Sequence, residues 1–271
     1  MKSFHLLKLT LFAVGGLTTV LNVVESFYVY IFHKPIFVHL YFMKKKLPKN
    51  KKEFLVSSIE FYQKLEPKYQ SYYEHRVAKF IRSYEFVERD GFEITPEMKV
   101  LIASSYVKLT FGMRRYLTAT FQRVIIYPEV YYSLLTKQYH KGEFNPAFKT
   151  ISFSWEDFLM GDIITNDNIN LGIHEFAHAL TFHGSSSRDA SARIFYRFFK
   201  RISNFLDEEE NIKEIQESAF FREYAMTNKL EFVAVILEHF FESPKELQQQ
   251  FPRLYAKIEA MLNYKSILDR Q

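Results

Sequence analysis

Residues 170–182 read NLGIHEFAHALTF, and the two histidines of this stretch are four positions apart. Residues four apart lie on one face of an α-helix, so His174 and His178 can direct their imidazoles at a single ion. The H-E-x-x-H pattern therefore requires a helix that carries both histidines and a further ligand from elsewhere in the fold. The alternative is a pair of core histidines that are satisfied by hydrogen bonds.

The residue between these histidines has a chemistry of its own. Glu175 is rotated by about 100° from His174 around the helix axis, so it lies beside the ion rather than on it. From there its carboxylate can accept a proton from an attacking water molecule. Because the chain contains no Cys, any metal must be held by imidazole and carboxylate groups, and one Zn²⁺ ion is the expected cofactor.

The third ligand cannot be a histidine at the metzincin spacing, because position 184 is Gly. Downstream carboxylates are therefore the candidates. Thr227 or Asn228 can cap a helix whose first turn contains Glu231, among apolar neighbours that leave a carboxylate in need of a partner. Glu238 follows seven residues later on nearly the same face. It could bind the metal itself or orient a ligand imidazole.

The order of the predicted elements indicates an α+β domain that is mostly helical with a small sheet. Helical spacing extends over 53–90 with a break at Glu66–Pro67, and Thr95 caps a helix from Pro96 to about Leu109. Residues 123–128 and 149–155 are predicted strands, separated by a loop or hairpin. The helix with the two histidines is expected to be capped by one of three polar residues: Asn166, Asp167 and Asn168.

Residues 1–43 form an apolar segment ahead of a predicted domain over 44–271. Residues 9–24 are uncharged, and the apolar stretch continues to Phe32 past the single acid Glu25. A continuous helix of about 24 residues would cross a hydrocarbon core of roughly 30 Å. The alternative is an apolar helix pair that packs on the domain.

The net charge of +5 is concentrated in one short run that directly follows the apolar segment. This run contains six lysines: Lys44, Lys45, Lys46, Lys49, Lys51 and Lys52. Since the rest of the chain is nearly balanced, no broad nucleic-acid-binding face is expected. Positively charged flanks stay on the cytoplasmic side, so we expect a single N-terminal anchor with the domain at the cytoplasmic face of the inner membrane.

Several blocks of the sequence resemble the Mlc titration factor A family of zinc-dependent peptidases, which are gluzincin-like H-E-x-x-H enzymes. The resemblance extends over about residues 53–265. It is carried by GFEIT and MKVLIAS within 91–104, VIIYP at 124–128, ISFSWEDF at 151–158, NLGIHEFAHAL at 170–180 and EYAMTNKLEFVAVILEHFF at 223–241.

This resemblance implies a zincin-like fold in which His174, His178 and Glu231 bind zinc and Glu175 is the catalytic base. It also implies that Tyr224 donates its phenol to the oxyanion of the attacked carbonyl. The resemblance further implies aminopeptidase-type activity on a peptide or protein substrate. The alternative function is a zinc-containing regulatory module that titrates a protein partner with little or no hydrolysis.

The strand predicted over 150–155 precedes the helix that carries the two histidines. We expect it to be the edge to which an extended peptide substrate adds as a further strand.

Overall fold

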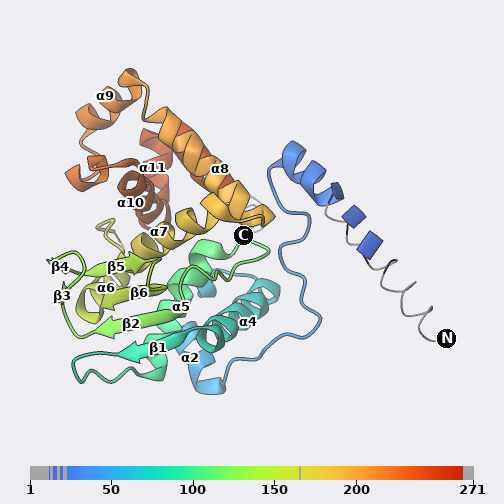
Figure 1. The fold of residues 1–271 in the computed structure, drawn as a ribbon, viewed down its shortest axis with the longest axis vertical. Helices are drawn as coiled ribbons and strands as arrows, with labels where there is room; N and C mark the ends of the chain where they lie inside the picture. The colour runs from blue at the N-terminus through green and yellow to red at the C-terminus, as the bar shows by residue number, and fades with distance from the viewer. Residues whose placement is uncertain (1–11, 13–14, 17–18, 21–22, 165, 265–271) are drawn as a thin grey trace.

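The computed structural model describes residues 12, 15–16, 19–20, 23–164 and 166–264 (Figure 1). Helices dominate this part of the chain, and a small sheet accompanies them, as the sequence predicts. The helices are α2 (Lys49–Ser58), α3 (Glu60–Gln63), α4 (Pro67–Ser83), α5 (Pro96–Thr110), α6 (Trp155–Ile163), α7 (Leu171–Ser186), α8 (Ala190–Phe205), α9 (Glu209–Ser218), the 3-10 helix η1 (Glu223–Met226), α10 (Lys229–Glu242), α11 (Pro244–Gln250) and α12 (Pro252–Leu262).

The main sheet has four strands in the order β1-β2-β6-β5 within the described residues. β1 (Glu85–Glu88), β2 (Arg123–Tyr127) and β6 (Thr150–Ser154) are parallel, and β5 (Gly142–Asn145) is antiparallel to β6. A separate hairpin, β3 (Tyr131–Ser133) with β4 (Gln138–His140), occupies part of the expected connection.

The expectation that the strand over 150–155 is an edge was wrong. β6 pairs with β2 on one side and with β5 on the other, and all five of its residues are buried. A strand that is buried along its whole length is typical of an interior position. The edge next to α7 is instead β5, whose four half-buried residues carry a weaker strand signal.

The helical prediction for 53–90 is confirmed at its break and wrong at its end. α4 begins at Pro67, where the proline ring fits the first turn of a helix. Residues 85–88 form β1 rather than helix, because Phe86 and Val87 pair with β2 in register. The helix predicted from Pro96 is confirmed as α5, with Thr95 Oγ1 accepting from the Met98 N–H.

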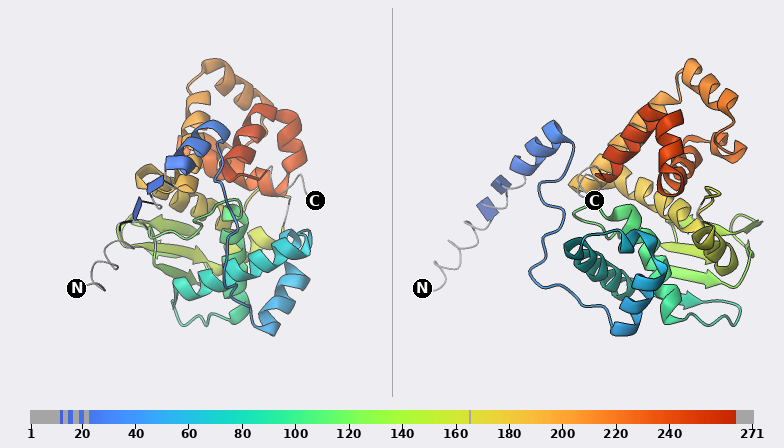
Figure 2. Two further views of the ribbon diagram at one scale, coloured as in Figure 1. Left: turned by 90° about the vertical axis from the view of Figure 1, so that its right-hand side faces the viewer. Right: turned by 180° about the vertical axis from the view of Figure 1, so that it is seen from behind.

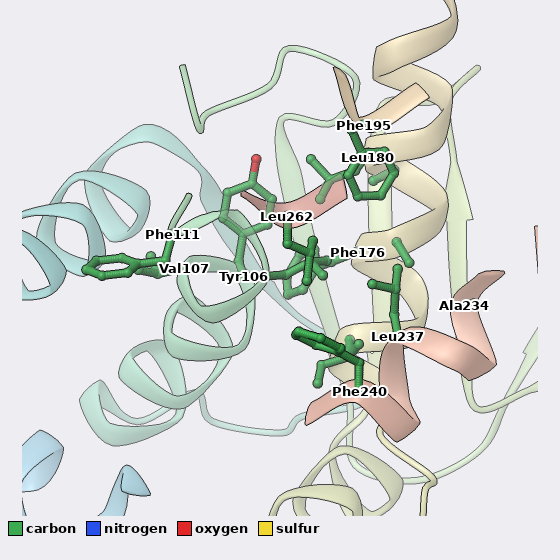
Figure 3. Packing of buried hydrophobic residues seen from close by; sticks show 14 of the residues in the cluster. Tyr106, Val107, Phe111, Phe176, Leu180, Phe195, Ala234, Leu237, Phe240 and Leu262 are labelled. Atoms are coloured by element: carbon green, nitrogen blue, oxygen red, sulfur yellow. The ribbon is translucent and has the colours of Figure 1, made fainter. Parts of the chain in front are cut away.

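One continuous core holds α7 between α5, α8 and α10 (Figure 3). Phe176 of α7 packs edge-on against Tyr106 of α5 at 5.0 Å between ring centroids. Leu237 and Phe240 of α10 fill the other side. Burial of each such side chain contributes about 1.5–3 kcal/mol, so the helix with the two histidines is fixed by packing along most of its length.

The described part of the N-terminal segment contacts the domain at several points (Figure 2). Residues 23–32 are helical, and Glu25 forms an ion pair with Arg114 at 2.5 Å. His33 then lies against Phe198 of α8, and Tyr41 accepts a hydrogen bond from Arg76. Much of the predicted anchor lies outside the described residues. In the part of the chain that is described, no helix is both long and apolar enough to span a bilayer.

Candidate metal centre

Helix α7 begins at Leu171, two residues later than the sequence predicts. Its cap is Asn170, whose Oδ1 accepts from the Ile173 N–H at 3.0 Å, and not one of the three polar residues at 166–168. Asn168 adopts a left-handed conformation with φ of 58°, so it belongs to the turn before the helix. The cap at Asn170 places His174 in the second turn of α7, where it is 7% exposed.

Helix α10 brings a carboxylate to the two histidines. Asn228 Oδ1 accepts from the N–H groups of Leu230 and Glu231, which confirms Asn228 as one of the two predicted caps. Because the helix starts at Lys229, Glu231 lies in its first turn and faces α7.

Three ligand atoms converge between α7 and α10. Glu231 Oε2 lies 2.9 Å from His174 Nε2 and 3.4 Å from His178 Nε2, and the two imidazole nitrogens are 3.1 Å apart. Among the described residues, His174, His178 and Glu231 form a group of side chains whose ligand atoms are close enough together to hold one metal ion. These three residues were predicted from the sequence as the metal ligands, and the structure brings them together.

The separations fit one tetrahedral ion. Ligand atoms at about 2.0–2.1 Å from a tetrahedral Zn²⁺ are separated by about 3.3 Å, close to the three distances found here. Glu231 Oε2 is buried and has no well-directed hydrogen-bond donor among the described residues, although the two nitrogens lie close to it. A buried carboxylate oxygen without a donor needs another partner, and a divalent cation provides one.

The charges of the site favour an anionic Glu231. Burial opposes ionisation, but the His174 and His178 imidazoles outweigh it and hold the pKa of Glu231 well below its usual range. Burial likewise disfavours a charged His174, yet the Glu231 and Glu238 carboxylates raise the pKa of His174 to about 10. Without a metal, a proton on His174 therefore balances these carboxylates.

Glu238 holds His174 from the opposite side of its ring. Its Oε1 lies 2.8 Å from His174 Nδ1 and accepts from Arg222 Nη2 at 2.7 Å. Its Oε2 accepts from the Asn170 N–H at 2.7 Å and from Arg222 Nη1 at 3.2 Å. The carboxylate is thus saturated with donors, and it leaves Nε2 of His174 free for a metal.

Glu175 lies between α7 and the edge strand β5. Burial raises its pKa, while the charges of His178 and His174 and the Phe144 backbone N–H partly offset this. Gly142 allows the close approach, because a methyl group at this position would lie 2.8 Å from Glu175 Cγ and 2.7 Å from Leu171 Cδ1. The general-base candidate is therefore buried, beside the metal ligands and against the sheet edge.

Tyr224 extends from η1 over the same site. Its ring centroid is 5.9 Å from that of His174, and its side chain is about half exposed. Burial and the Glu231 carboxylate raise its pKa, so the phenol keeps its proton at neutral pH. A protonated phenol at the rim can donate a hydrogen bond to an oxyanion.

The sequence did not single out three residues that shape this site, namely Arg222, Asn170 and Gly142. Arg222 Nη1 also donates to the Asn168 carbonyl at 2.6 Å, so it ties the loop before α7 to α10. The available signals were weak: an arginine two residues before Tyr224, an asparagine four before His174, and a glycine in a short strand.

Comparison with known protein families identifies the family to which this chain belongs. The profile of a family described as glucose-regulated metallo-peptidase M90 matches residues 39–263. The chain belongs to the M90 family. The match includes α7, α10 and every residue of the candidate metal centre, and it confirms the resemblance to the Mlc titration factor A family.

Relatives of this M90 chain are distant in sequence. An uncharacterised protein of Synechocystis sp. is 24% identical over 237 residues, which cover 78% of this chain and 82% of the relative. Mlc titration factor A of Yersinia pestis is 24% identical over 196 residues, which cover 66% of this chain and 71% of the relative. The protein of the same name from Yersinia pseudotuberculosis gives the same values.

Proposed function

We propose that this M90 chain is a zinc-dependent peptidase. The observation that carries the proposal is the convergence of His174 Nε2, His178 Nε2 and Glu231 Oε2 to within 3.4 Å of one another, beside the buried Glu175. A zinc ion bound by these three groups would act as a Lewis acid on the scissile carbonyl and lower the pKa of a water molecule. A site that held zinc only for structure would have no need of Glu175.

Glu175 would accept the proton of the attacking water and pass it to the leaving amine. Its raised pKa suits it to both steps, because a general base works best when its pKa lies near the working pH. His174 would stay oriented by Glu238 and Arg222 throughout. Tyr224 would donate a hydrogen bond from its hydroxyl to the oxyanion that forms at the attacked carbonyl, which is where stabilisation counts most.

The substrate would be a peptide in an extended conformation. β5 is the edge strand on the side of the sheet where Gly142 contacts Glu175, so a chain added along β5 would pass the base and the metal ligands. Cleavage next to a free amino terminus is the form that the resemblance implies. Matched peptides with free and acetylated amino termini would separate aminopeptidase from endopeptidase activity.

The test is hydrolysis of a panel of peptide and amino-acid anilides by the zinc-loaded protein. We expect turnover that chelation abolishes and that added zinc restores. Glu175→Gln should retain zinc and lose turnover by about 10²–10⁴-fold, the usual contribution of a general base. Zinc-loaded wild type with no turnover on the whole panel, or a Glu175→Gln variant as active as wild type, would contradict the proposal.

The second candidate function is a zinc-containing regulatory module that binds a protein partner. It is favoured by the name of the Yersinia relatives, Mlc titration factor A, and by their coverage of most of this domain. Here zinc would hold α7 and α10 together, and Glu175→Gln would not change partner binding. Stoichiometric zinc without turnover, combined with binding that Glu175→Gln leaves intact, would favour this candidate.

The location at the cytoplasmic face of a membrane remains a prediction from residues 1–52. Fractionation of the whole chain and of a variant that begins at Lys49 tests it directly. Recovery of both in the membrane-free fraction would contradict the prediction.

A further inference from the structure

A cavity of about 490 Å³ lies between the segment 58–64 and the helices α5, α6 and α10. None of the metal-centre residues His174, His178, Glu231, Glu175 and Tyr224 lines it. Its volume falls in the range of small-molecule sites. Three half-buried charged side chains, Lys108, Asp162 and Glu242, line it together with aromatic rings that include Phe61 and Phe241. The other charged residues of its lining are exposed: Glu60, Lys64, Lys245 and Glu246.

The charges of this cavity are not paired with one another at short range. Among the described residues, Lys108 Nζ forms no ion pair within 4.0 Å, and it lies over the Phe241 ring at 5.2 Å from the centroid. Burial lowers the pKa of Lys108 and raises that of Asp162, and each charge partly offsets the other's shift. Burial also raises the pKa of Glu242 to about 7. One basic and two acidic side chains therefore face a common space with unused bonding capacity.

Two buried oxygen atoms of the cavity also lack partners. Ser104 is 3% exposed, and its Oγ has no hydrogen-bond partner among the described residues. Glu242 Oε2 is buried and equally unpartnered, while Oε1 accepts from Asn170 Nδ2 at 3.2 Å. Such atoms cost free energy unless a bound molecule completes their hydrogen bonds.

We infer that this cavity binds a small zwitterion, either a free α-amino acid or a short linear peptide, and that Asn170 links it to the metal centre. The ligand's carboxylate would pair with Lys108, and its ammonium would lie between Asp162 and Glu242. The apolar part would pack on Phe61 and Phe241. A simple anion fits poorly because two of the three half-buried charged groups are acidic, and a simple cation would leave Lys108 without a counter-ion.

The link to the metal centre runs through the side chain and the backbone N–H of a single residue, Asn170. Asn170 Nδ2 donates to Glu242 in the cavity, and the Asn170 N–H donates to Glu238 at 2.7 Å. Glu238 in turn contacts His174 Nδ1 at 2.8 Å. A ligand ammonium on Glu242 would change the charge at one end of this chain of contacts. If the peptidase function holds, the ligand is a product of the reaction and this path gives feedback.

The binding test uses metal-free protein, because amino acids chelate zinc. Isothermal titration with the free L-amino acids and a set of dipeptides should show saturable binding of at least one of them. N-acetylation removes the ammonium of the ligand, and amidation removes its carboxylate. Each modification should weaken the binding of that ligand by about tenfold or more. Whichever of the two ligand classes, amino acids or dipeptides, binds more tightly is the class that the cavity recognises. No saturable binding in either arm would overturn the inference.

Variants place the ligand in this cavity. Lys108→Met and Glu242→Gln should each weaken binding by about tenfold or more. Lys64→Met is the matched control, because Lys64 lines the same cavity but pairs with Glu60 at 2.6 Å on the surface, and it should stay within about threefold of wild type. Folded Lys108→Met and Glu242→Gln variants that bind as wild type does would overturn the site. The acetylated and amidated ligands, tested on the wild-type protein, show whether binding requires both charges of the zwitterion, even where a variant fails to fold.

The link is tested on the same metal-free protein by nuclear magnetic resonance of the imidazoles. The His174 ring signals should shift along the binding curve of the ligand, whereas those of His33, outside both sites, should not. An unchanged His174 at saturation would overturn the link through Asn170. Since neither measurement needs zinc or turnover, failure here is distinguishable from failure of the peptidase proposal.

Discussion

Two carboxylates of α10, Glu231 and Glu238, contact the same imidazole from opposite sides and have opposite surroundings. The Glu231 side chain is 16% exposed; its Oε2 lies near His174 Nε2 and has no well-directed donor among the described residues. Glu238 lies near Nδ1, its side chain is 1% exposed, and its oxygens make four contacts with nitrogen atoms.

The difference shows how the surroundings of two glutamates in one helix suit Glu231 and Glu238 to different roles. Seven residues are nearly two helical turns, so both carboxylates face α7. Arg222, the Asn170 N–H and His174 Nδ1 together occupy the four lone-pair sites of Glu238, which leaves none for a cation. Glu231 receives no such donors and keeps an oxygen available for a metal. One carboxylate is thus suited to bind an ion and the other to orient the ring.

The largest expected effect comes from removing the available carboxylate. Glu231→Ala should lose stoichiometric zinc and all turnover. A four-ligand zinc site is worth about 10–16 kcal/mol, so one ligand is worth about 3 kcal/mol, or more than a hundredfold in affinity. Metal analysis after gel filtration checks this. If Glu231→Ala keeps one zinc per chain and Glu238→Ala does not, the two roles are reversed.

The next largest effect concerns the phenol near Glu231. Tyr224→Phe should retain zinc and lower kcat by about a hundredfold, because the developing oxyanion loses a donor, while KM changes little. Steady-state kinetics on the best anilide substrate measure it. A wild-type kcat for Tyr224→Phe would show that Tyr224 does not stabilise the oxyanion.

A smaller effect is expected for the carboxylate that orients His174. Glu238→Gln keeps the size of the side chain but not its charge, and it should weaken zinc binding by about ten- to a hundredfold. Competition with a chromophoric chelator gives the affinity. Glu242→Gln, one turn further along α10, serves as a control that should leave zinc affinity in the absence of amino acids close to wild type.

The smallest effect is a pH dependence. The carboxylates raise the pKa of His174 to about 10 in metal-free protein, so this ring is protonated at neutral pH and must lose its proton to bind zinc. Zinc affinity should therefore rise by about tenfold per pH unit between about pH 7 and 9, with one proton released per ion. Titration calorimetry in buffers of different ionisation enthalpy counts that proton. Zinc binding without release of this proton would contradict the assigned charge of His174.

The sequence predicts the parts of the site that depend on local spacing. The four-residue interval places both histidines on one face of α7, and Asn228 sets the first turn of α10 and so the position of Glu231. The choice between Glu231 and Glu238 could not be made from spacing. It depends on Arg222 and on the Asn170 N–H, and Asn170 is 68 residues from Glu238 in the chain.

Tertiary contacts also explain the incorrect predictions. The order of the sheet depends on β5, four residues whose strand character comes from pairing with β6 rather than from their own propensity. Residues 85–88 fall inside the span 53–90 that was predicted as helical, yet pairing with β2 makes them the strand β1. The cavity at Lys108 combines segments more than a hundred residues apart, so no local pattern indicates it.

The central claim is that His174, His178 and Glu231 hold one zinc ion. Crystallography of the zinc-loaded protein, with anomalous scattering recorded at the zinc absorption edge, tests it most directly. We predict a single anomalous peak at about 2.0–2.2 Å from Nε2 of both histidines and from a carboxylate oxygen of Glu231, with Glu238 still on Nδ1 of His174. A peak coordinated by Glu238, or zinc bound elsewhere with these three side chains unliganded, would contradict the account.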